Sequence, residues 1–194
     1  FNLQHPRIVD ARTQLVSQLY YSKYDFELYS NFTFFARDAE NGDQIRQVED
    51  RHLVGYRGRI LRQGSLLGLP LNLQFGTSIR FDRVNDNELS YTLNRETTLG
   101  NVALGDVTEL NAALFAEANW QLSPKLRAQG ALRYDRFRFQ YLDQLQTLYN
   151  PQAVADGILS PKLSLFYQVA DQWQLFARAA RGFHSNDTRL ILAQ

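Results

Sequence analysis

Cysteine and methionine are both absent from the 194 residues. Without cysteine the chain has no disulfide, no thiolate-bound metal and no cysteine nucleophile. Without methionine we expect Phe1 not to be a translation start, and the chain to be processed or cut from a longer one. Apolar runs of the roughly 18 residues that a membrane helix needs are lacking, but the strands of a transmembrane barrel are apolar only at alternate positions.

An excess of charge is also lacking, because 21 Lys and Arg stand against 20 Asp and Glu. We therefore expect no nucleic-acid partner.

Hydrophobic and polar residues alternate along most of the chain. In the clearest stretch the odd positions are Leu69, Leu71, Leu73, Phe75, Thr77, Ile79 and Phe81, and the even positions from 72 on are Asn72, Gln74, Gly76, Ser78, Arg80 and Asp82. A helix would mix the two classes on one face, whereas a strand separates them. The same alternation predicts eight strands, at about 11–22, 25–36, 51–62, 69–83, 107–120, 125–141, 159–169 and 172–184.

The connections between these strands alternate in length. Short ones are predicted at 23–24, 62–68, 121–124 and 170–171, and long ones at 37–50, 84–106 and 142–158. This layout is typical of outer-membrane barrels, and a tilted strand from Leu71 to Phe81 climbs about 25 Å, the height of their apolar band. Aromatic residues near the strand ends favour the same interpretation: Tyr20, Tyr21, Trp120 and Trp173 by the short turns, and Phe34, Phe81 and Tyr134 nearer the long loops. We predict an all-β fold, an antiparallel transmembrane β-barrel section of about eight long amphipathic strands.

The faces opposite the apolar ones are charged. They carry Glu27, Arg57, Arg59, Arg80, Glu117, Arg127, Arg133, Asp135, Lys162 and Arg178. A dry sandwich core would not accept these side chains, because an unpaired buried charge is strongly destabilising, whereas a hydrated or plugged lumen would. Two interpretations stay open: an Arg-rich wall that meets an anionic ligand or an acidic plug, and cross-strand pairing of these cations with Glu and Asp in the wall. For the first, Arg80, Arg133 and Arg178 are the candidate ligand-binding residues.

No pattern in the chain indicates catalysis or metal binding. His184, Ser185 and Asp187 have the residue types of a hydrolase triad, but neighbours on an extended segment point in alternating directions and cannot form that relay. The three His residues, at 5, 52 and 184, lack metal-ligand spacing. The acidic stretch at 38–50 does not match a calcium loop and is interpreted as a solvated loop. We expect no catalytic residue, no metal site and no cofactor, and hence no enzyme.

Four segments resemble the barrel of TonB-dependent outer-membrane receptors. They are YDFELYSNFTFF at 24–35, NGDQIRQVEDR at 41–51, GALRYDRFRF at 130–139 and, most strongly, SPKLSLFYQVADQWQLFARAARGFHSNDTR at 160–189. The resemblance covers about 11–189. It implies a Gram-negative outer-membrane barrel of about 22 strands around a plug. It also implies uptake of a scarce solute, such as an iron–siderophore complex, a cobalamin or a sugar. The implied partners are outer-membrane lipid, the plug, TonB acting through the plug, and a small-molecule ligand such as a metal chelate.

The resemblance also sets an expectation for domain organisation. Residues 1–194 contain no recognisable plug or TonB-box segment, and eight strands are about a third of such a barrel. If the short turns face the periplasm, both ends of the chain lie on the outer side. We therefore expect residues 1–194 to be an internal part of a single receptor barrel domain, with the plug domain absent. Two alternatives stay open: a small, complete eight-stranded barrel with a structural or passive role, and a soluble all-β binding module or enzyme.

Overall fold

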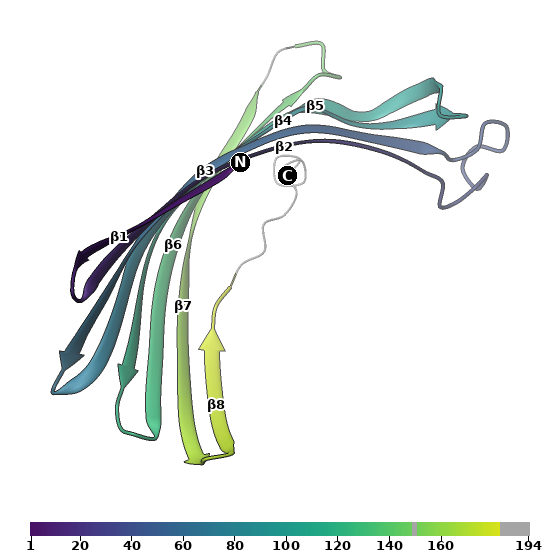
Figure 1. The fold of residues 1–194 in the computed structure, drawn as a ribbon. Coiled ribbons are helices and arrows are strands. Elements are labelled where there is room, and N and C mark those ends of the chain that lie inside the picture. The colour runs from purple at the N-terminus through teal and green to yellow at the C-terminus, as the bar shows by residue number, and fades with distance from the viewer. Residues whose placement is uncertain (149–150, 183–194) are drawn as a thin grey trace.

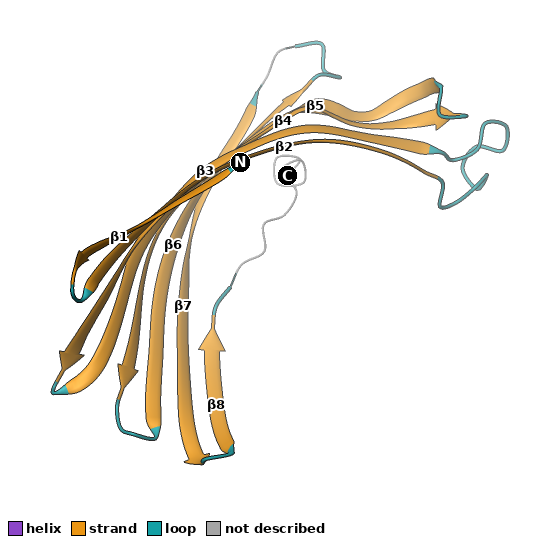
Figure 2. Ribbon diagram, viewed as in Figure 1, coloured by secondary structure: helices purple, strands orange, loops and turns teal. Residues whose placement is uncertain are grey.

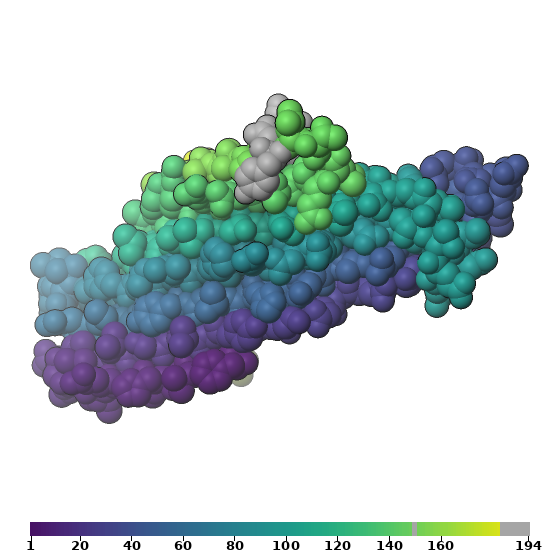
Figure 3. Space-filling model, turned by 90° about the horizontal axis from the view of Figure 1, so that it is seen from above, coloured from purple at the N-terminus to yellow at the C-terminus, as the bar shows by residue number. Residues whose placement is uncertain are grey.

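The computed structural model describes residues 1–148 and 151–182, which form one antiparallel sheet. Its strands are β1 (Asn2–Asp10), β2 (Thr13–Ser30), β3 (Ile45–Leu66), β4 (Leu69–Leu93), β5 (Thr97–Gln121), β6 (Leu126–Asp143), β7 (Gln152–Ala170) and β8 (Trp173–Ala180). They lie side by side in chain order (Figures 1, 2 and 3). Within the described residues β1 and β8 are the two edges of the sheet and do not pair with each other. These eight strands therefore do not close into a complete small barrel.

The strands are long, and their connections alternate between the two ends of the sheet. β4 and β5 have 25 residues each, against an average of about 5–6 in soluble proteins. One end of the sheet carries the connections 11–12, 67–68, 122–125 and 171–172, and the other carries 31–44, 94–96 and 144–151. In Figure 1, β2–β5 extend and curve far beyond the rest of the sheet at this second end. In the part of the chain that the structure describes, no helix has the length and hydrophobicity to cross a membrane.

The register keeps apolar side chains on one face of the sheet. A line of paired residues runs from β2 to β7 through Leu15, Ile60, Phe75, Ala116, Leu132 and Pro161. We call this side the apolar face, and the side of Gln74 and Arg80 the polar face. On the apolar face Phe75 is 47% exposed and Leu114 is 66% exposed. A single-layer sheet with so much exposed apolar surface needs an apolar cover, which a membrane supplies.

The first hairpin differs from the prediction. A turn at 23–24 between strands 11–22 and 25–36 is wrong, because β2 runs unbroken through these residues and pairs with β3 without a register shift. The turn lies at Ala11–Arg12, after β1, and residues 31–36 lie in a loop. β1 was not predicted because it puts His5 and Arg7 in the apolar-face rows, opposite Ser17 and Leu15. Its sequence therefore shows no alternation.

The unbroken β2 reverses the faces predicted for its second half. Glu27 lies an even number of residues after Tyr21 on the unbroken β2 and pairs with Val48 of β3. It therefore lies on the apolar face, like Tyr21, and its assignment to the polar face is wrong. The hydrophobic alternation changes face after Tyr21 because Lys23, Asp25 and Glu27 follow on the apolar face. The change marks the place where the strand leaves the apolar environment, and it does not mark a turn. Tyr21 accordingly lies far from the short connection that was predicted beside it.

The predicted long loops are mostly strand. The predicted loop 84–106 is wrong, because β4 extends to Leu93 and β5 begins at Thr97. In the same way β3 begins at Ile45 and β7 at Gln152. Beyond the apolar band both faces of a strand meet water, so nothing requires hydrophobic alternation there and the pattern gives no strand signal. The extensions are held by ladder pairs such as Ser90↔Asn101.

Candidate functional site

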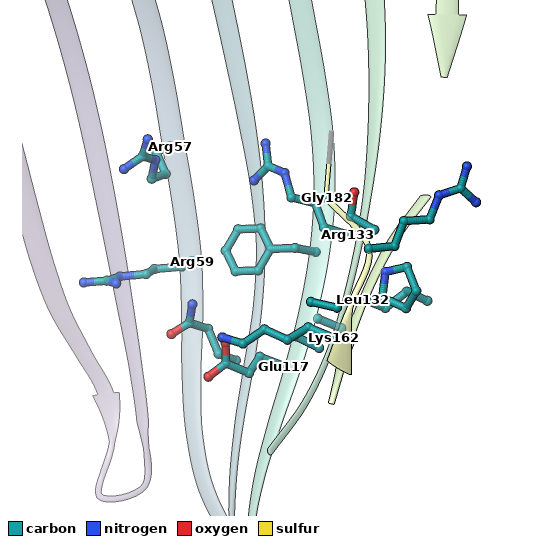
Figure 4. A pocket seen from close by; sticks show the side chains of 15 residues that line it. Arg57, Arg59, Glu117, Leu132, Arg133, Lys162 and Gly182 are labelled. Atoms are coloured by element: carbon teal, nitrogen blue, oxygen red, sulfur yellow. The ribbon is translucent and has the colours of Figure 1, made fainter. Parts of the chain in front are cut away.

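The polar face is hollowed between β3 and β8, and cations surround the hollow (Figure 4). Its volume is about 470 Å³. Among the described residues, the charged side chains that line it are Arg57, Arg59, Glu117, Arg133, Lys162 and Arg181. Five cations thus face one carboxylate. The hollow is an electropositive surface suited to anionic groups.

Strand parity explains why these side chains meet. Arg57 and Arg59 flank Gly58 on β3, so both project from the polar face, and Arg59 lies opposite Gly76 of β4, which has no side chain. Neither arginine has an ion pair or hydrogen bond with another described residue. Their guanidinium groups are therefore available to a partner other than the described residues.

Glu117, the one carboxylate among the described lining residues, is held by amides. Glu117 accepts hydrogen bonds from Asn119 Nδ2 at 3.2 Å and from Gln129 Nε2 at 2.8 Å. Lys162 lies two strands away at the same level, across Ala131 of β6. Figure 4 shows its side chain extended towards Glu117. Glu117 thus offsets only part of the positive charge.

The three predicted ligand-binding arginines all lie on the polar face, but the structure brings only two of them together. Arg80 of β4 and Arg133 of β6 line a second hollow of about 200 Å³. Arg178 of β8 is absent from its lining. The Nε of Arg178 instead donates a hydrogen bond to Ser164 Oγ of β7 at 3.2 Å. Arg178 therefore stands apart from the other two.

Buried aspartates anchor Arg80 and Arg133. Arg133 donates to both carboxylate oxygens of Asp135, from Nε at 2.7 Å and from Nη2 at 2.8 Å. Asn111 adds a third donor at 3.1 Å. Asp135 is 1% exposed, whereas the Arg133 side chain is 38% exposed. Arg80 forms an ion pair through Nη2 with one oxygen, Oδ2, of the buried Asp82. Each guanidinium is thus held by a buried aspartate and remains partly exposed to the hollow.

These ion pairs run along strands and not across them. Arg80–Asp82 and Arg133–Asp135 both have the spacing Arg-x-Asp, which places the two side chains on the same face of one strand. The expected cross-strand pairing is therefore not the main arrangement of these arginines. The two Arg-x-Asp segments are visible in the sequence and could have predicted it. Arg181 lines the larger hollow and was not predicted there, because the predicted strand 172–184 puts position 181 on the same face as Trp173 and Leu175, whereas β8 ends at Ala180.

The loop 31–44 projects from the end of the sheet that carries the longer connections, and its own aspartates order it. Asp43 accepts hydrogen bonds from Thr33 Oγ1 at 2.6 Å and from the backbone N–H groups of Arg37 and Asp38, both at 2.9 Å. The Thr33 hydrogen bond first, and then these N–H groups, hold the pKa of Asp43 below its ordinary value. Asp38 similarly accepts from the N–H groups of Glu40 and Asn41. The carboxylates in this part of the acidic stretch thus bind backbone.

Other candidate chemistry is not assembled in the described residues. No three His, Asp or Glu side chains of residues 1–148 and 151–182 lie together as a metal site. His184, Ser185 and Asp187 lie outside the described residues. The polar face therefore holds the strongest candidate site among the described residues, and its excess of positive charge suits it to anionic groups.

Comparison with known proteins finds similar folds in solved transport proteins. The fold is similar to that of the ferric citrate transporter FecA in the unliganded form, with a TM-score of 0.75 at 11% identity over 91% of this chain and 26% of that one. It is also similar to the ferric-catecholate import receptor Fiu from E. coli K12 in its open form, with a TM-score of 0.68 at 9% identity over 92% and 34%. It is similar as well to the copper transporter OprC, with a TM-score of 0.68 at 16% identity over 92% of this chain and 30% of that one. The chain spans about a quarter to a third of these proteins.

The family itself is shown by sequence. Residues 1–192 match the model of a family described as TonB dependent receptor-like, beta-barrel. Barrels of this family lie in the outer membrane of Gram-negative bacteria, and the family consists of transport receptors and not of enzymes. The long antiparallel strands, the exposed apolar face and the charged inner wall agree with this match. The chain belongs to the TonB-dependent receptor family and is a section of its β-barrel.

Proposed function

We propose that this chain is part of a receptor that takes up a scarce solute across the outer membrane, with energy supplied through TonB. The family supports this proposal, and so do solved neighbours named for ferric citrate, ferric catecholates and copper. We propose a metal chelate, such as an iron–siderophore complex, as the solute. Residues 1–194 would form part of a single barrel domain whose plug is a separate segment.

The observation that carries the proposal is the charge of the polar face. Five cations line the larger hollow beside one carboxylate. Chelates built from carboxylate or catecholate oxygens are commonly anionic, and guanidinium groups bind such oxygens with paired, charge-assisted hydrogen bonds. An electropositive lumen wall would attract this class of solute and would repel free metal cations.

Within this wall, Arg80, Arg133 and Arg178 are the proposed ligand contacts. The anchored pairs Arg80–Asp82 and Arg133–Asp135 fix two guanidinium groups while leaving each partly exposed, at 46% and 38%. A side chain that is already ordered loses less entropy on binding, which favours affinity. Arg178 has one described partner, Ser164, and retains donors for a ligand lower on the wall.

The proposed partners follow from the two faces. Outer-membrane lipid would cover the apolar face, and the receptor's own plug would occupy the lumen beside the polar face. TonB would act through the plug and not on this section of wall. Because β1 and β8 are unpaired edges within the described residues, further strands of the same barrel would complete the sheet.

Ligand binding to the full-length receptor tests the proposal. We expect Arg80→Gln and Arg133→Gln each to weaken binding of the recognised chelate by about tenfold or more, because each removes a charged donor. Arg178→Gln is expected to act in the same direction. The probes are ferric citrate and a ferric catecholate, titrated separately against the purified receptor, and free Cu²⁺ is the cation that we expect not to bind.

Arg127→Gln is the matched control, because Arg127 lies on the same face but is stacked on Phe166, with its guanidinium carbon 4.5 Å from the ring centroid. We expect this variant to bind like the wild type. Equal affinity in all three test variants and the control would refute the assignment of the ligand contacts. Failure of both chelates to bind the wild-type receptor, or binding of Cu²⁺ alone, would refute the proposed class of solute.

A further inference from the structure

On three strands the apolar face ends with an aromatic residue that is followed, two positions later, by a cation. Two positions beyond Tyr21, Phe81 and Tyr134, on the same face, stand Lys23, Arg83 and Arg136. The aromatic residues are 41%, 38% and 46% exposed. Barrels of this class carry aromatic girdles at both interfaces, and their longer loops lie on the outer side. The change from aromatic residue to cation therefore marks the outer edge of the lipid-covered band on β2, β4 and β6.

Most cations at this edge already have partners on their own face. Lys23 lies 3.4 Å from Asp25 and 3.7 Å from Asp50, and His52 lies 3.5 Å from the same Asp50 oxygen. Arg83 donates from Nε to Asn85 at 2.9 Å. The charge on β2 and β3 is thus largely neutralised, whereas Arg83 of β4 keeps its charge but already uses one donor on Asn85.

Arg136 and Arg138 of β6 differ from these cations. Both are exposed on the apolar face, and neither makes an ion pair or hydrogen bond with another residue in the ranges 1–148 and 151–182. The register gives them Ala112 and Leu110 as neighbours on β5, and Gly157 and Ala155 as neighbours on β7. No acid stands among these neighbours, and three of them are small. Two adjacent guanidinium groups therefore have open space beside them and no counter-charge.

Tyr134 adds a third donor to the same patch. A side chain built on Gly157 would collide with the hydroxyl end of Tyr134, so the phenol leans over Gly157, directly beside Arg136. Its hydroxyl has no described hydrogen-bond partner within the resolved strands. The ring continues the lipid-covered band, and the hydroxyl lies at its edge, which is the usual position of tyrosine at a membrane interface.

We propose that Arg136, Arg138 and Tyr134 bind the phosphate groups of lipids in the outer leaflet. Two guanidinium groups and a phenol match the oxygen-rich, strongly anionic character of a phosphomonoester such as those of lipid A. The patch is continuous with the apolar band that contacts the acyl chains, so a phosphate reaches it while its own chains remain in the membrane. A soluble anion lacks this second attachment. The site lies on the opposite face of the sheet from the ligand hollows and does not depend on the proposed uptake.

The test uses the full-length receptor in a non-ionic detergent, titrated with bis-phosphorylated lipid A. We expect the double variant Arg136→Gln/Arg138→Gln to bind this lipid at least about tenfold more weakly, because two charged donors are removed. Lys23→Gln is the control, because Asp25 and Asp50 already neutralise that cation, and it should bind like the wild type. Dephosphorylated lipid A should bind the wild type as weakly as the phosphorylated lipid binds the double variant.

Three results would overturn the proposal: unchanged affinity in the double variant, equal affinity of the two lipids, or displacement of the lipid by millimolar inorganic phosphate. The last would make the patch a site for free anions. If the double variant does not fold, Arg136→Lys/Arg138→Lys replaces it. That variant keeps the charge but loses the paired donors, so it should bind several-fold more weakly. Wild-type affinity in this lysine variant would also contradict the proposal.

Discussion

Replacing Leu114 by arginine should destabilise the full-length receptor in lipid bilayers by about 2–4 kcal/mol, the cost of arginine on the lipid face near the bilayer centre. Leu114 projects from the middle of β5, between Trp120 and Leu110 on the apolar face, and is 66% exposed. In water such exposure would make the substitution harmless. In lipid the guanidinium has no hydrogen-bond partner, and this difference produces the effect. Equilibrium unfolding in vesicles by urea measures the change.

Gln74→Arg is the matched control for this experiment. Gln74 lies on the polar face of β4, directly opposite Glu117, so a new guanidinium there meets a carboxylate and water. We expect its cost to stay below about 1 kcal/mol, as for most surface substitutions. If the two variants are equally stable, lipid does not cover the apolar face.

Replacing Asp135 by asparagine should cost about 2–3 kcal/mol, because it removes the charge that holds a half-buried guanidinium. Asp135 is 1% exposed and accepts two of the three Arg133 side-chain hydrogen bonds, the third going to Ser78 Oγ. An amide has one acceptor oxygen, and its NH₂ group would face the Arg133 donors. The same unfolding assay measures this loss, and removal of Arg133 together with Asp135 should cost less than the sum of the two single changes.

Glu117→Gln is the comparison for Asp135. Glu117 is a carboxylate on the same face, but its described donors are the amides of Asn119 and Gln129, which a glutamine oxygen can still accept. Its loss should be below about 1 kcal/mol. An equal cost for the two substitutions would show that the Arg133–Asp135 pair adds no more than an ordinary hydrogen bond.

The sequence predicted the fold where the membrane imposes a pattern. Between Leu71 and Phe81 one face meets lipid and the other meets the lumen, so the alternation is complete and β4 was located correctly. Beyond the band both faces meet water, and the predicted loop at 84–106 is strand for this reason. The prediction of the first hairpin was wrong because the change from apolar to polar residues at Lys23 resembles a turn when the partner strand is unknown.

The candidate site shows a similar limit. The alternation of side chains along each strand was enough to place Arg80, Arg133 and Arg178 on the polar face. Their distance from one another depends on the stagger between strands, which no single strand contains, and the structure shows Arg178 apart from the other two. The buried partners of Arg80 and Arg133 lie two residues along the same strand and were accessible from the sequence. Glu27 was assigned to the wrong face because the turn predicted at 23–24 reversed the faces of the residues that follow it.

The central claim is that lipid covers one face of this sheet and the other faces a polar lumen. Residues 1–194 contain no cysteine, so single cysteines from Leu71 to Asp82 can carry nitroxide labels in the full-length receptor in bilayers once any cysteine outside these residues has been replaced. The measurement is the collision rate of each label with oxygen, which concentrates in lipid, relative to a water-soluble nickel complex. The structure predicts a ratio that is high at odd positions, low at even positions, and alternates with a period of two. A ratio that does not alternate, or that is highest at Asn72, Gln74 and Ser78, would contradict it.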